Sequence, residues 1–167
     1  SKEYNYEFKI LDAVMEVNQS QKLKIVEKMM KYYGGDVKGK KFALWGLAFK
    51  PDTDDIREAP ALYLIDEFLK EGAMVYAYDP EAMSNVQMQY GDKINFALDA
   101  MDACEGADFL VIATEWSVFR TLDFEELGSK LKNKLIFDGR NLYDLKQMKD
   151  KGFTYISIGR RIIKPEE

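Results

Sequence analysis

Two basic residues stand where an anionic ligand could be bound. Lys50 lies in the segment Gly-Leu-Ala-Phe-Lys-Pro at 46–51, where Pro51 restricts it to an extended or turn conformation. Such a lysine acts as a point charge on a phosphate. Arg140, in Asp-Gly-Arg-Asn at 138–141, presents a planar guanidinium suited to a phosphate or a carboxylate. From the residues alone, a solvated surface lysine explains Lys50 equally well, so both alternatives stay open.

Phe49 and Arg57 are further candidates from the same segment. Phe49 fits either core packing, the commoner fate of a phenylalanine, or a platform for a flat base. Arg57 precedes a helix expected to begin near Pro60, and a cation at a helix N-terminus is unfavourable unless an anion offsets it. An ion pair with Asp52 or Glu58 is the favoured explanation from the residues alone, and a bound anion is the alternative.

Several other polar residues have both a structural and a functional interpretation. Asp54 or Asp55 is expected to cap the helix near Pro60. Asp79 ends a predicted strand, where dinucleotide enzymes often place a carboxylate on a ribose, although a turn role is equally compatible. Trp116 fits stacking on a ligand or, more commonly, packing beneath the next helix.

The composition excludes several kinds of site. The 167 residues include no His and one Cys, which removes imidazole-based triads, His-containing metal sites and internal disulfides. Cys104 has Asp102 and Glu105 nearby, and their carboxylates oppose thiolate formation, so we do not expect a nucleophile there. The net charge of −5 argues against nucleic acid. No apolar stretch approaches the roughly 18 residues of a membrane span, so we expect a soluble, cytoplasmic protein without membrane contact.

The segments that must position these residues alternate between short apolar runs and helical patterns, which is typical of a parallel sheet. We predict an α/β fold: a Rossmann-like, doubly wound parallel sheet with the strand order 3-2-1-4-5-6. The strands are expected at 42–46, 74–78, 94–96, 109–113, 135–137 and 153–156, with helices at about 61–69 and 100–104. Ligands of such sheets bind beyond the carboxyl ends of the strands, which directs attention to the loops at 47–57, 114–117 and 138–141.

A long helix is expected before the sheet, over 6–33, because Pro and Gly are absent there and apolar residues recur at helical spacing. Gly34 and Gly35 are expected to end it. Its polar middle favours a connecting or interface helix over a core helix, and we expect a homodimer through it. The C-terminal residues 161–167 are expected to fray.

The loop at 46–51 lacks the Gly-x-Gly-x-x-Gly fingerprint of a dinucleotide site. Its sequence resembles instead the C-terminal part of the UDP-glucose 6-dehydrogenase family, and the resemblance covers nearly the whole chain. The matching strings are Gly-Leu-Ala-Phe-Lys-Pro-Asp-Thr-Asp-Asp-Ile-Arg-Glu-Ala-Pro-Ala at 46–61, Tyr-Asp-Pro at 78–80, Thr-Glu-Trp at 114–116, Phe-Asp-Gly-Arg-Asn at 137–141 and, in the helix, Val-Asn-Gln-Ser-Gln-Lys at 17–22.

The resemblance implies a parent enzyme that oxidises the sugar C6 hydroxyl of UDP-glucose to a carboxylate with NAD and a nucleophilic cysteine. It implies that Lys50 and Arg140 contact the UDP-sugar, that Phe49 lines its site, and that Arg57 reaches NAD held mainly by a preceding domain. It also implies part of a central linking and dimerisation helix at 1–35 and a UDP-sugar-binding domain at 36–167. Neither the NAD fingerprint nor a Gly-Gly-Ser-Cys nucleophile motif occurs, so we expect the chain alone to be catalytically inactive.

Two alternatives remain at this point. The first is a related dehydrogenase of GDP-mannose or of a UDP-N-acetylamino sugar, which shares the 46–61 motif, although Phe-Asp-Gly-Arg-Asn favours the glucose enzyme. The second is a stand-alone, non-catalytic module that binds a nucleotide or a partner helix.

Overall fold

The protein is built around a six-stranded, wholly parallel sheet with the order β3-β2-β1-β4-β5-β6. The computed structural model describes residues 14, 17 and 24–165. The observed order confirms the predicted one. The strands are β1 (Lys41–Trp45), β2 (Met74–Tyr78), β3 (Asn95–Phe96), β4 (Phe109–Ile112), β5 (Leu135–Asp138) and β6 (Thr154–Ser157).

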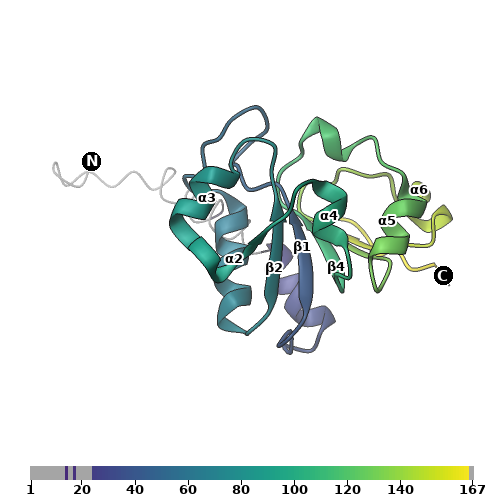
Figure 1. Ribbon diagram of the computed structural model, residues 1–167. Coiled ribbons are helices and arrows are strands. Elements are labelled where there is room, and N and C mark those ends of the chain that lie inside the picture. Colours follow the sequence, from purple (N-terminus) through teal and green to yellow (C-terminus); the bar gives the residue numbers. More distant parts are fainter. Residues whose placement is uncertain (1–13, 15–16, 18–23, 166–167) are drawn as a thin grey trace.

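Helices cover both faces of the sheet, as Figure 1 shows. Alternate strand residues point to opposite faces, so Phe42 and Trp45 of β1 mark the two sides. Phe42 packs against Phe68 of α2, whereas the Trp45 indole donates to the Ala100 carbonyl at the start of α4. The helices are α2 (Pro60–Lys70), α3 (Met83–Tyr90), α4 (Ala100–Cys104), α5 (Phe124–Lys130) and α6 (Leu145–Asp150), with 3-10 turns η2 (Gly91–Lys93) and η3 (Ser117–Phe119).

The helical residues 24–32 pack on the sheet rather than apart from it. Ile25, Val26 and Met29 are buried in the same core as the strands. Tyr33, directly after the helix, lies 5.2 Å from the Phe109 ring of β4, between ring centroids. The preference against a core helix is therefore wrong for 24–32, because one side of the helix is buried in the core. The role of the helix as a connection to another domain stays a prediction.

The end of that helix confirms the prediction from the two glycines. Gly34 and Gly35 have φ angles of 63° and 88°, and the Gly35 amide donates back to the Met30 carbonyl at 2.8 Å. This left-handed ending satisfies a carbonyl of the last turn. The earlier part of the predicted helix, except Val14 and Val17, lies outside the described residues, as does the proposed dimer contact.

The C-terminal segment is more ordered than expected. Ile163 is buried, and it exchanges two backbone hydrogen bonds with Tyr155 of β6, at 2.9 and 3.0 Å, in an antiparallel bridge. The prediction of a frayed end is wrong up to this point of the chain. The apolar pair Ile162 and Ile163 is the sequence signal for this contact.

Candidate functional site

All strands run in one direction, so the loops that follow β1, β2, β4 and β5 lie at one edge of the sheet. The loops after β1 and β4 touch at Gly46. Its φ angle is 86°, and a Cβ built there would stand 2.6 Å from both Cβ and the backbone nitrogen of Thr114. The Thr114 hydroxyl also donates to the Ala48 carbonyl at 2.5 Å. Only glycine permits this crossing of the two loops.

Asp79, at the end of β2, holds the start of the β1 loop. Its side chain is buried, and one carboxylate oxygen accepts hydrogen bonds from the backbone amides of Leu47 at 2.6 Å and Ala48 at 3.1 Å. The same oxygen accepts from the Trp116 indole at 3.0 Å. The other oxygen accepts from the two amides that precede α3, those of Glu81 and Ala82.

These contacts decide between the alternatives for Asp79 and Trp116. Asp79 forms a turn, and its buried oxygens are already occupied by protein donors, so a ribose role is not supported. Trp116 is buried and packs within the fold rather than presenting a free ring. The amides of Leu47 and Ala48 are likewise occupied, although these are the groups that a dinucleotide loop directs at phosphate. A phosphate at this edge therefore cannot use these two amides, and the basic side chains of the loops are the remaining charged donors.

The rest of the β1 loop projects its side chains outward. The Phe49 amide donates to the Asp55 carbonyl at 2.8 Å and so closes the loop on itself. Phe49 is 44% exposed, and Lys50, the next residue in the chain, is exposed as well. The commoner core role for Phe49 is therefore wrong, and an exposed ring next to a cation remains compatible with a ligand surface.

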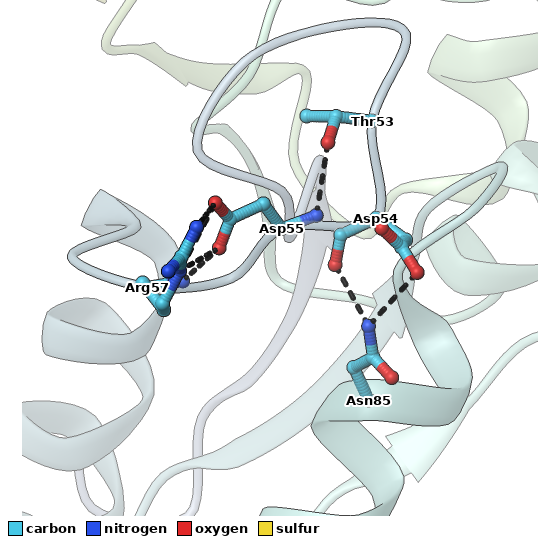
Figure 2. A network of polar contacts seen from close by, with 5 residues as sticks. All are labelled: Thr53, Asp54, Asp55, Arg57 and Asn85. Carbon is cyan, nitrogen blue, oxygen red and sulfur yellow. Dashed lines mark hydrogen bonds and ion pairs between the residues drawn. The ribbon is translucent and has the colours of Figure 1, made fainter.

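A polar network fastens residues 53–57 of the same loop (Figure 2). The side-chain amide of Asn85, from α3, donates to the Asp54 carbonyl at 2.9 Å and to its carboxylate at 3.3 Å. The hydroxyl of Thr53 accepts from the Asp55 amide at 3.2 Å. These contacts connect the β1 loop with the helix that follows β2.

Arg57 forms a two-pronged ion pair with Asp55, at 2.9 Å from Nε and 2.6 Å from Nη2. The prediction that Arg57 forms an ion pair is therefore confirmed. The predicted partners, Asp52 or Glu58, are wrong, because the partner is Asp55. The cap prediction is also wrong: α2 begins at Pro60 after Ala59, without a side-chain cap. A proline at the first position lacks one of the donors that a cap would satisfy.

The Asp55–Arg57 pair has a measurable electrostatic consequence. Hydrogen bonding from the Arg57 guanidinium lowers the pKa of Asp55 from 3.8 to about 2, and Lys50 adds the smallest contribution. The folded-state pKa is depressed, so the pair is fully present above pH 4 and is lost as the pH falls through about 2.

We expect Arg57→Gln to raise the pKa of Asp55 toward 3.8, because the main donor to its carboxylate is removed. The measurement is a pH titration of the Asp55 carboxyl ¹³C shift by NMR. Lys50→Gln is the matched control, with a smaller rise. A titration curve of Asp55 that is the same in wild type and Arg57→Gln contradicts the ion pair.

Arg140 follows β5 in a turn, and it is paired with the loop after β4. Its Nε donates to a carboxylate oxygen of Glu115, and both side chains are about one-third exposed. Glu115 is the middle residue of the Thr-Glu-Trp string at 114–116, and its position in the sequence does not indicate this long-range partner. The structure thus connects Arg140 with the β4 loop, which Thr114 in turn connects with the β1 loop that carries Lys50. Convergence of Lys50 and Arg140 on one ligand stays a prediction.

A cysteine nucleophile, a metal site and a membrane-spanning helix are three further features to look for among the described residues. Cys104 is buried, and burial raises the pKa of its thiol well above the ordinary range, which agrees with the expectation that it is not a nucleophile. Within 24–165, no group of His, Cys, Asp and Glu side chains could hold a metal ion. No helix in the described part is long and apolar enough to cross a membrane.

The sheet order and the carboxyl-edge loops define a Rossmann-like α/β domain whose β1 loop has its amides occupied from within and exposes side chains instead. Residues 43–145 match the model of the UDP-glucose/GDP-mannose dehydrogenase family, UDP binding domain. This match covers more than half of the chain, and the chain belongs to that family.

Curated relatives support the same family. The chain is 38% identical over its whole length to the UDP-glucose 6-dehydrogenase TuaD of Bacillus subtilis, and 42% identical over 96% of its length to a UDP-glucose 6-dehydrogenase of Pseudomonas aeruginosa. It spans 36% of the length of each relative.

A solved UDP-glucose dehydrogenase from Pyrobaculum islandicum is similar to this fold, with a TM-score of 0.76 and 28% identity over 95% of the chain and 33% of that structure. The UDP-D-ManNAc dehydrogenase of Pyrococcus horikoshii shares the fold, with a TM-score of 0.70 and 23% identity over 93% of the chain and 35% of that structure.

Proposed function

We propose that the chain is the UDP-sugar-binding domain of a UDP-glucose 6-dehydrogenase, an NAD-dependent oxidoreductase. The family match and the relatives support this proposal. One observation of the structure carries it: the backbone amides that would cradle a phosphate are bound to Asp79, while basic side chains stand on the β1 and β5 loops at the same edge. A diphosphate recognised by side chains suits this arrangement.

In this proposal Lys50 and Arg140 neutralise the diphosphate of the UDP-sugar, and the exposed Phe49 ring lines the nucleotide site. Arg57 lies on the same loop as Lys50 and reaches toward NAD. The β1 loop does not offer a dinucleotide cradle of its own, since the Leu47 and Ala48 amides donate to Asp79. NAD would therefore be held mainly by another domain, and oxidation of the sugar would need that domain.

We expect UDP to bind weakly to this chain and both Lys50→Ala and Arg140→Ala to weaken binding by about 10-fold or more, because each removes a charged donor to phosphate. Titration of UDP by calorimetry or by ¹H–¹⁵N NMR measures the affinity. Lys146→Ala is the matched control, because Lys146 pairs with Asp150 on the exposed side of α6. Unchanged affinity in both site variants, or no binding at millimolar UDP, contradicts the assignment.

The same titration with GDP separates the glucose enzyme from a GDP-mannose enzyme. We propose preference for UDP, on the strength of the two UDP-glucose 6-dehydrogenase relatives. A homodimer through the N-terminal helix and a cytoplasmic location are also part of the proposal. The residues expected to form the dimer contact lie almost entirely outside the described part of the chain.

A further inference from the structure

The turn that carries Arg140 is tied down by β5 itself. One carboxylate oxygen of the buried Asp138 accepts from the Arg140 amide at 2.7 Å, and the other accepts from the Leu142 amide at 2.7 Å. The hydroxyl of Tyr155, in β6, donates to the second oxygen at 2.6 Å. These bonds fix the two ends of the turn around Asn141, whose backbone has a positive φ of 57°.

The side chain of Asn141 ties the same turn to the residues after β6. Its amide nitrogen donates to the Ile158 carbonyl at 3.1 Å, and its amide oxygen accepts from the Ile158 amide at 3.1 Å. The side chain thus pairs with one residue of backbone as a neighbouring strand would. Both groups are partly buried, where such a reciprocal pair is directional.

Arg160 supplies a second connection between these segments. Its guanidinium donates to the Tyr143 carbonyl at 3.0 Å and to the Asn141 carbonyl at 3.4 Å. The segment that carries Ile158 and Arg160 is itself closed by the Tyr155–Ile163 bridge. The Arg140 turn is therefore held between a strand end and a closed C-terminal loop.

We propose that Asn141 and Arg160 are positioning residues that set the direction of Arg140 for the anionic part of the ligand. This inference rests on the proposed function, because it takes Arg140 as a diphosphate contact. Arg140 is bonded at its own amide by Asp138 and at its side chain by Glu115, while Asn141 and Arg160 fix the next residue of the backbone. Loss of either connection lets the turn rotate without removing any group that touches the ligand.

The test is a double-mutant cycle on UDP affinity in the full 167-residue chain. Asn141→Gly keeps the positive φ accessible and deletes the amide pair. Arg160→Lys keeps the charge and deletes the two-pronged contact. We expect each to weaken UDP binding by about 5- to 10-fold in the wild-type background and by less than about 2-fold in the Arg140→Ala background.

Ser157→Ala is the matched control. Ser157 lies in the same segment, and its buried hydroxyl has no hydrogen-bond partner among the described residues. We expect UDP affinity to be unchanged in this variant. Thermal unfolding of every variant shows whether the fold is retained, and Arg160→Lys, at an exposed position, keeps the test decisive if Asn141→Gly unfolds.

The outcomes separate this inference from the proposed function. If Arg140→Ala and Lys50→Ala both leave UDP affinity unchanged, the site assignment itself fails. If only Arg140→Ala does, Arg140 is not a ligand contact and the positioning role is overturned with it. If Arg140→Ala weakens binding but Asn141→Gly and Arg160→Lys do not, or weaken it equally in both backgrounds, the positioning role is overturned while the proposed function stands.

Discussion

Asp79→Asn is expected to lower the free energy of unfolding by about 3–5 kcal/mol. An asparagine retains one accepting oxygen and replaces the other with an NH₂ group, which only donates. In either orientation, at least two donors that now reach the Asp79 carboxylate lose their acceptor, and these donors are buried or partly buried. Each buried donor without an acceptor costs about 1–3 kcal/mol. Equilibrium unfolding in urea measures the change.

Asp144→Asn is the matched control for this substitution. Asp144 caps α6 by accepting from the Lys146 and Gln147 amides at an exposed position, and asparagine caps helices about as well as aspartate. We expect a change below about 0.5 kcal/mol. Equal losses of stability at 79 and 144 would contradict the central role of Asp79 in joining the loops.

The second large effect is expected for Gly46→Ala, at about 2–5 kcal/mol of lost stability. Two costs add here. The φ angle of 86° is strained for any residue with a Cβ, and that Cβ would stand 2.6 Å from the Thr114 backbone nitrogen. The loops after β1 and β4 would have to separate, so we also expect amide shifts around Ala48 and Thr114 in the NMR spectrum.

Gly35→Ala separates the two costs. Gly35 has nearly the same φ, 88°, with nothing within 4 Å of a built Cβ. It therefore reports the backbone strain alone, about 1–2 kcal/mol. If the two glycine variants lose the same stability, the collision with Thr114 does not contribute and the close crossing of the loops is wrong.

The sheet could be predicted because its signals are local and strong. β4 and β5 are short runs of buried residues, and the alternation with helical segments leaves few topologies once crossovers are right-handed. The helix α3 was missed because only Val86 and Tyr90 of its eight residues are buried. The helices α5 and α6 had a usable signal: Asp123 and Asp144 stand three residues before a Glu and a Gln.

The sequence predicts which loops carry the cations of the site, but not which acidic residue pairs with each cation. Topology places Lys50, Arg57 and Arg140 at the carboxyl edge, and their charge suggests an anion. Which acid each cation meets depends on loop backbone that sequence pattern does not specify. Arg57 turns back two residues to Asp55, and Arg140 crosses to Glu115 in another loop. The long-range roles of Asp79 and Asn141 depend on the same non-local geometry.

The buried carboxylate at the end of β2 has a consequence for selectivity. In this fold the turn after the first strand is the usual seat of a cofactor pyrophosphate. Here the Asp79 side chain already accepts hydrogen bonds from those amides. A cofactor pyrophosphate at this turn would find the Leu47 and Ala48 amides already bonded. In the proposed function, the fold that often binds a cofactor pyrophosphate through loop amides would instead bind a sugar nucleotide through the side chains of exposed loops.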